Sequence, residues 1–192
     1  MDEVLWAAGR ATGFVSLALM TLSVVLGILV RSGRRAAGTP RFAWTLVHRN
    51  ASLLATVFLG IHVGSLMLDS YAKLDLVDLV VPFLGAYKPF WQGLGTVALD
   101  LLLAVVVTAL LRHRIGPRAF RAVHWLAYAV WPVAVAHAVG NGTDGTSTWF
   151  LLSATAAVVV VGAAAAWRLS AGFIESAALR QTGAGTRRGE AA

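Results

Sequence analysis

Long apolar stretches constrain this chain more than any other feature of its sequence. Five of them reach the roughly 17 to 25 residues that a helix needs to cross about 30 Å of hydrocarbon. They are residues 11–30, 42–68, 94–111, 119–140 and 149–167. With 58% hydrophobic and 13% charged residues, the composition is typical of multi-span membrane proteins. The sequence therefore predicts an all-α integral membrane helical bundle of about five transmembrane helices.

The basic residues indicate which ends of these helices share a side of the membrane. All but three of the 16 Lys and Arg residues lie after the first span, at the start of the second, between the third and fourth, or after the fifth. A sixth apolar stretch, residues 74–90, contains charged residues and prolines, and the basic loops would fall on opposite sides if it crossed. We expect it to lie at the interface. By the positive-inside rule, the N-terminus is then outside the cytoplasm and the C-terminus inside.

Composition also excludes several kinds of chemistry. The chain contains no cysteine, so disulfides, iron–sulfur clusters and covalently attached haem are excluded. The net charge of +7 is explained by the one-sided topology, and we expect no nucleic-acid partner. Residues 1–168 form the predicted domain of a multi-pass cell-membrane protein. Residues 169–192 form a polar cytoplasmic tail that we expect to be at least partly disordered.

Two of the predicted spans each carry a pair of histidines. His48 and His62 lie seven residues inside the charged ends of the second span, and His124 and His137 lie six and seven residues inside those of the fourth. Because the two spans run in the same direction, His48 and His124 share a depth on the inner side. His62 and His137 share a depth on the outer side. Ionisable residues within a membrane are rare and usually functional.

The spacing of each pair can be compared with helical geometry. On the second span it is 62 − 48 = 14 residues, about 40° short of four turns and roughly 21 Å along the axis. On the fourth span it is 137 − 124 = 13 residues, which leaves the imidazoles about 140° apart in a straight helix. Pro132 lies between them, and proline distorts a helix. The alignment of the second pair therefore depends on that distortion.

The chain resembles the ferric reductase-like transmembrane domain family. That family includes ferric reductases, NADPH oxidase membrane domains and the haem-binding membrane subunit of a bacterial periplasmic methionine sulfoxide reductase. The resemblance covers roughly residues 10–167. The features that carry it are the pair beginning His48-Arg49-Asn50, the pair His124 to His137, the stretch Pro82-Phe83…Tyr87…Trp91…Gly93-Leu94-Gly95, and Gly142-Thr143-Asp144.

The resemblance implies cofactors, ligands and a function. In the family such pairs ligate two b-type haems, with one ligand from each helix, so His48 and His124 would hold an inner haem and His62 and His137 an outer haem. The implied function is electron transfer from a cytoplasmic or membrane donor, a flavoprotein or a quinone, to an extracytoplasmic acceptor such as ferric iron or a partner protein. Ferric reductases and NADPH oxidases commonly carry six spans and a flavin and nicotinamide domain. This chain has neither, so we expect it to need a partner donor.

Four cations and one tyrosine near the membrane faces are candidates to pair with, or donate a hydrogen bond to, the anionic haem propionates. They are Arg41, Arg49 and Arg121 at the inner haem, and Tyr87 or Lys88 at the outer haem. The competing explanation for each arginine is positive-inside topology alone.

Other polar residues leave alternatives open. Asp100 in the third span could accept a hydrogen bond from an outer ligand, could move protons, or could bond locally to Thr96. His113, between two arginines, is typical of a solvated basic turn. A haem-free transporter with a proton path of histidines and Asp100 is the alternative from another class. A second version of the haem hypothesis makes the chain a subunit that passes quinone or flavin electrons to a periplasmic oxidoreductase.

Overall fold

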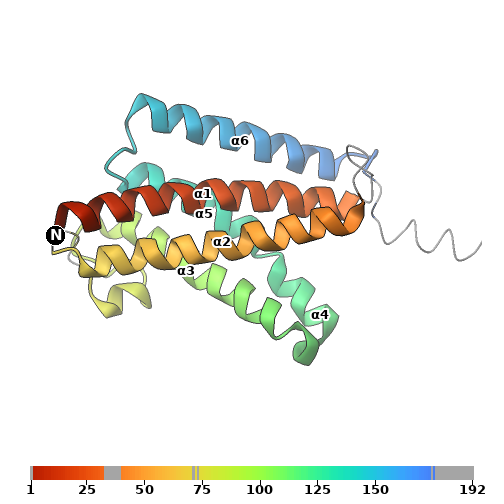
Figure 1. The fold of residues 1–192 in the computed structure, drawn as a ribbon, viewed down its shortest axis with the longest axis horizontal. Helices are drawn as coiled ribbons and strands as arrows, with labels where there is room; N and C mark the ends of the chain where they lie inside the picture. The colour runs from red at the N-terminus through yellow and green to blue at the C-terminus, as the bar shows by residue number, and fades with distance from the viewer. Residues whose placement is uncertain (1, 33–39, 71, 73, 174, 176–192) are drawn as a thin grey trace, which may run out of the picture.

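The computed structural model describes residues 2–32, 40–70, 72, 74–173 and 175 (Figure 1). In this part of the chain there is no β-strand, so the predicted all-α class is confirmed. The elements in chain order are α1 (Asp2–Ser32), α2 (Arg41–Leu68), the short 3-10 helix η1 (Leu76–Leu79), α3 (Pro89–Leu110), α4 (Arg112–His124), α5 (Ala127–Asn141) and α6 (Thr148–Leu169). Most of the predicted tail, residues 174 and 176–192, lies outside the described residues.

The described helices are consistent with the predicted count of membrane spans. Helices α1, α2, α3 and α6 are each long and apolar enough to cross a membrane, and α4 with α5, bent by 46° relative to each other, makes a fifth if the pair counts as one span. Between α2 and α3, the described residues contain only the four-residue η1, which is too short to cross. Helix α3 begins at Pro89, five residues before the predicted start, and proline suits the first turn because its missing N–H has no helical partner there.

The bend in the fourth span does not lie where the sequence suggested. The break falls at residues 125–126, directly after His124, whereas Pro132 lies inside α5. Around the break, three backbone N–H groups bond to the carbonyl three residues earlier: Leu126 to Val123, Tyr128 to Trp125, and Ala129 to Leu126. Such 3-10 bonding winds the chain by about 120° per residue instead of 100°. This overwinding reduces the 140° offset between the two imidazoles.

The helices pack as two groups, α1 with α2 and α6, and α3 with α4 and α5, which are joined by contacts between α1 and α5. Helix α1 packs along the whole of α2 and also contacts α5 and α6, while α3 packs against α5 and α4 (Figure 1). Among the described residues, α2 has no comparable packing against α3, α4 or α5. The two histidine-bearing spans are therefore held apart, and the space between them is available to a cofactor.

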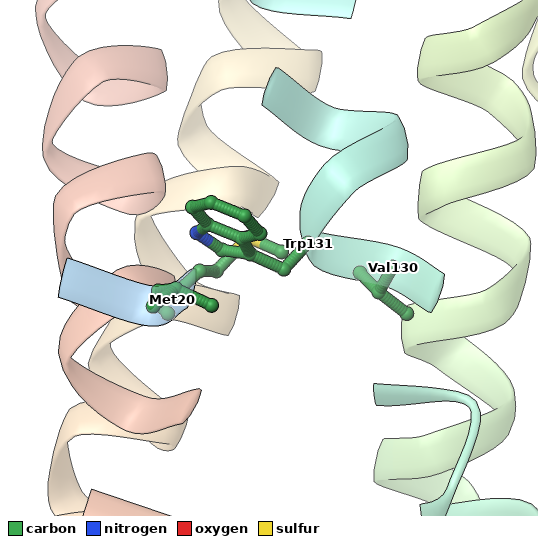
Figure 2. Close-up of a cluster of buried hydrophobic side chains, with 5 residues drawn as sticks. Met20, Val130 and Trp131 are labelled. Carbon is green, nitrogen blue, oxygen red and sulfur yellow. The ribbon is translucent and has the colours of Figure 1, made fainter. Parts of the chain in front are cut away.

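A buried apolar layer lies at mid-height of the bundle. Its residues are Met20, Ala55, Val130, Trp131 and Val161. Figure 2 shows the Trp131 ring extending from α5 toward Met20, and the Trp131 indole N–H donates to the Thr21 hydroxyl at 2.9 Å. Because Ala55 and Trp131 lie about halfway between the two histidines of their spans, this layer separates an inner histidine pair from an outer one.

Candidate functional site

The outer pair of histidines lines one cavity. His62 of α2 and His137 of α5 both face a cavity of about 400 Å³, whose walls also include Trp6 and Met20 of α1 and Gln92 of α3. Its volume falls within the roughly 300–1,000 Å³ of typical small-molecule and cofactor sites. The structure thus brings together the two residues that share the outer depth in the sequence.

Hydrogen bonds to backbone carbonyls orient both outer imidazoles. The Nδ1–H of His62 donates to the carbonyl of Gly9 at 2.6 Å, and that of His137 donates to the carbonyl of Trp91 at 2.8 Å. A carbonyl can only accept, so the proton of each neutral ring resides on Nδ1. The Nε2 lone pair of each ring is therefore free to bind a metal, and the hydrogen bond from Nδ1 to the carbonyl holds the ring in place.

The inner pair lies close together across the space between α2 and α4. The ring centroids of His48 and His124 are 6.4 Å apart, and their planes are nearly perpendicular at 87°. The Nδ1–H of His48 donates to the carbonyl of Ser23 at 2.9 Å, which again leaves Nε2 free. The Nδ1 of His124 is buried and, among the described residues, has no hydrogen-bond partner.

The separation of the inner pair fits a metal whose other ligands come from a cofactor. Within the described residues, no three His, Cys, Asp or Glu side chains gather in a way that could hold a metal ion. Iron in a porphyrin needs only axial ligands from the protein. Metal–imidazole bonds of about 2 Å on opposite sides of one ion place the ring centroids roughly 6 Å apart, which the inner pair nearly matches at 6.4 Å.

Buried polar atoms without partners also cluster around the two pairs. In the described residues they are Trp44 Nε1, Gln92 Nε2, His124 Nδ1 and Asn141 Oδ1. Gln92 and Asn141 line the outer cavity, while Trp44 lies one helical turn before His48 on the same face of α2. Such atoms are rare in folded proteins, and each one indicates a hydrogen-bond partner outside the protein, such as a water molecule or a bound group. Both pairs are therefore suited to a bound group that has polar parts of its own.

Of the described residues predicted to pair with haem propionates, only Tyr87 lines the outer cavity. Arg49 is exposed, Arg121 is exposed with its Nε donating to the carbonyl of Pro117 at 3.1 Å, and the side chain of Arg41 lies outside the described part of the chain. Tyr87 lines the outer cavity, and Lys88 Nζ donates to the carbonyl of Gly140 at 3.0 Å. The assignment of these residues to propionates stays a prediction.

The structure corrects one role suggested for Asp100. The Nδ1 atoms of the two outer histidines bond to backbone carbonyls, so neither donates to this carboxylate. Thr96 bonds to the carbonyl of Asp78 instead, and Asp100 is exposed on α3. His113 is exposed, as expected, but it lies in the first turn of α4 and not in a loop.

Sequence reasoning missed the groups that orient the histidines. These are backbone carbonyls on α1 and α3, and a carbonyl carries no residue-type signal. The amide of Gln92 was also missed, although it lies between Trp91 and Gly93 of the recognised stretch.

Comparison with known protein families decides the classification. The family model for the ferric reductase-like transmembrane component matches residues 12–135 of the chain. The chain belongs to this family. Members of the family are generally haem-binding proteins of transmembrane electron transfer. The matched segment contains three of the four histidines that form the two pairs, and His137 lies two residues beyond its end. Comparisons with curated proteins and with solved structures gave no match.

Proposed function

We propose that this ferric reductase-like chain carries electrons across the membrane on two b-type haems, each ligated by one histidine of α2 and one of the α4–α5 span. His48 and His124 hold the inner haem, and His62 and His137 hold the outer haem. Haem supplies a one-electron couple at each level when bound. The remaining work belongs to the protein, which ligates, orients and buries the cofactor.

The observation that carries this proposal is the state of the imidazoles. In three of the four, Nδ1 is tied to a backbone carbonyl on a neighbouring helix and Nε2 remains free. A proton relay needs both ring nitrogens to exchange protons, whereas a metal ligand needs one fixed and one free. The arrangement therefore supports ligation over the transporter alternative.

The positions of the charges support a direction. Of the described arginine side chains, Arg31, Arg49, Arg112, Arg114, Arg118, Arg121 and Arg168 lie toward the end of the bundle where α1 and α6 finish, and Arg10 lies toward the opposite end. We take this end as cytoplasmic, by the positive-inside rule, and the membrane as the cell membrane. A flavoprotein or quinone then donates to the inner haem, and an extracytoplasmic acceptor, such as ferric iron or a partner protein, takes electrons from the outer haem.

A haem assay tests the function directly. The purified full chain should show a dithionite-reducible b-type spectrum with two haems per chain. His62→Ala should lose about half of that haem, because one axial ligand of one site is removed. His113→Ala is the matched control, since this exposed histidine lies outside both pairs, and it should keep the full haem content.

Two results would contradict the proposal. One is a wild-type chain that takes up no haem when haem is supplied during expression. The other is equal haem content in His62→Ala and wild type. Proton flux through haem-free liposomes would favour the transporter instead.

A further inference from the structure

Each outer histidine lies against a glycine of the neighbouring helix. A Cβ built on Gly13 of α1 would lie 2.8 Å from Nδ1 of His62, and one built on Gly95 of α3 would lie 2.6 Å from Cε1 of His137. Real Cβ atoms essentially never make contacts this short, so a larger residue does not fit unless the imidazole moves.

The inner pair repeats the arrangement once. A Cβ built on Gly27 of α1 would lie 3.3 Å from Cε1 of His48, a tight contact but a milder one. The two glycines of α1 are 27 − 13 = 14 residues apart, which equals the spacing of the two histidines on α2. Because α1 and α2 pack side by side in opposite directions, each glycine meets one histidine.

All three glycines occupy the same position relative to the carbonyl that binds the imidazole. Each stands four residues after it: Gly9 and Gly13, Ser23 and Gly27, Trp91 and Gly95. In an α-helix the Cα–Cβ bond tilts toward the N-terminus, so a side chain covers the turn before it. A side chain at the fourth residue would therefore cover that carbonyl, and glycine leaves it open.

Other positions in this chain show what happens when the fourth residue has a hydroxyl. Thr12 donates to the carbonyl of Ala8 at 2.6 Å, and Thr21 donates to that of Leu17 at 2.8 Å. In both cases the threonine hydroxyl bonds to the carbonyl four residues earlier, which is the carbonyl that an imidazole bonds to when the fourth residue is glycine. A carbonyl has two lone pairs, of which the helix uses one, so a close hydroxyl takes the other. Thr12 Oγ1 also reaches the Gly9 carbonyl that anchors the outer imidazole of α2, but only at 3.3 Å.

Within the part of the chain that the structure describes, the Nδ1 of His124 has no hydrogen-bond partner, and no glycine lies against its ring. Thr108 stands 108 − 95 = 13 residues after Gly95, and His124 stands 137 − 124 = 13 residues before His137. At this equivalent position on α3, the Thr108 hydroxyl donates to the carbonyl of Ala104 at 2.7 Å. On this register, the Ala104 carbonyl is the one that corresponds to the three anchoring carbonyls, and the Thr108 hydroxyl already uses it.

We propose that Gly13, Gly27 and Gly95 are positioning residues of the haem sites: each leaves open the carbonyl four residues before it, which then fixes the axial imidazole with Nε2 toward the iron. This inference rests on the proposed function. It further assigns two carbonyl-anchored ligands to the outer haem and one to the inner haem. A carbonyl acceptor enriches the imidazole in electron density and favours ferric iron, so its loss raises the potential.

The test uses alanine variants of the full chain, with haem content, low-spin EPR signals and a redox titration as readouts. Gly13→Ala and Gly95→Ala should raise the midpoint potential of the outer haem and shift its EPR signal, with loss of up to half of the total haem. Gly27→Ala should affect only the inner haem, and more weakly, because its clearance is larger. Gly60→Ala and Gly162→Ala are the controls, since a Cβ at either meets no atom within 4 Å.

The outcomes separate this inference from the function. Haem-loaded Gly13→Ala, Gly27→Ala and Gly95→Ala with wild-type potentials and EPR signals would overturn the positioning role and leave the function standing. Equal shifts in the control variants would overturn it too, because the effect would then follow from any added methyl group. A wild-type chain without haem would overturn both.

Discussion

At the scale of single residues, the outer site combines neutral polar groups with cations that are already engaged. Lys88 donates to the carbonyl of Gly140, and Arg10 is paired with Asp144. Gln92 Nε2, by contrast, is buried in the cavity wall with no partner among the described residues. A buried donor without an acceptor costs about 1–3 kcal/mol. A chain that keeps one at its cofactor cavity is suited to bind an acceptor there, such as a propionate.

Replacing this amide should affect the stability of the haem-free protein and the rate of haem dissociation in different ways. Gln92→Leu removes an unsatisfied donor, so the haem-free chain should be as stable as wild type or more stable. Its outer haem should dissociate about 10- to 100-fold faster, because a hydrogen bond to a charged group contributes about 1.5–3 kcal/mol. Transfer of haem to apomyoglobin measures this rate. Asn50→Leu, at an exposed position on α2, is the control, and an unchanged rate in Gln92→Leu would exclude the amide as an anchor.

At the scale of helices, hydropathy predicted the apolar spans, because each depends on the composition of its own residues, and the distribution of the basic residues was needed to exclude a further crossing at residues 74–90. Hydropathy could not place the break at residues 125–126, which arises from a change in backbone bonding that no single residue type specifies. The pairing of the histidines followed from depth alone. Their anchoring did not, because the carbonyls belong to other helices. Only the matching 14-residue spacings of the α1 glycines and the α2 histidines could have revealed it.

Helix α3 carries an acidic side chain where the membrane is least able to solvate a charge. Asp100 lies near the midpoint of Pro89–Leu110, is exposed, and has no hydrogen-bond or ion-pair partner among the described residues. A carboxylate at the centre of a transmembrane helix costs about 2.5–3.5 kcal/mol on insertion scales. Asp100→Leu should therefore raise the unfolding temperature of the isolated chain in lipid nanodiscs, as followed by tryptophan fluorescence. Asp100→Asn should give a smaller rise, and a fall in both variants would mean that the carboxylate stabilises the fold.

At the scale of the whole molecule, α1 acts as the scaffold on which the two histidine levels are aligned. It supplies the carbonyl anchors of His48 and His62, contacts α5 and α6, and pairs with the loop before α6 through Arg10 and Asp144. Helix α3 supplies the third anchor through Trp91. Because the anchoring carbonyls lie on α1 and α3 and the three anchored histidines on α2 and α5, the proposed cofactor space can stay open between helices that do not pack closely against each other.

The direction of electron transfer depends on how this bundle sits in the membrane, and the chain allows a clean test because it contains no cysteine. Ser70→Cys places a thiol at an exposed position after α2, at the end that holds the N-terminus; His113→Cys places one in the exposed basic turn at the other end (Figure 1). A membrane-impermeant maleimide should label Ser70→Cys in intact cells and His113→Cys only after permeabilisation, while the unsubstituted chain stays unlabelled. The opposite pattern would put the basic end outside. His62 and His137 would then lie nearer the cytoplasm, and the donor and acceptor sides proposed for the two haems would exchange.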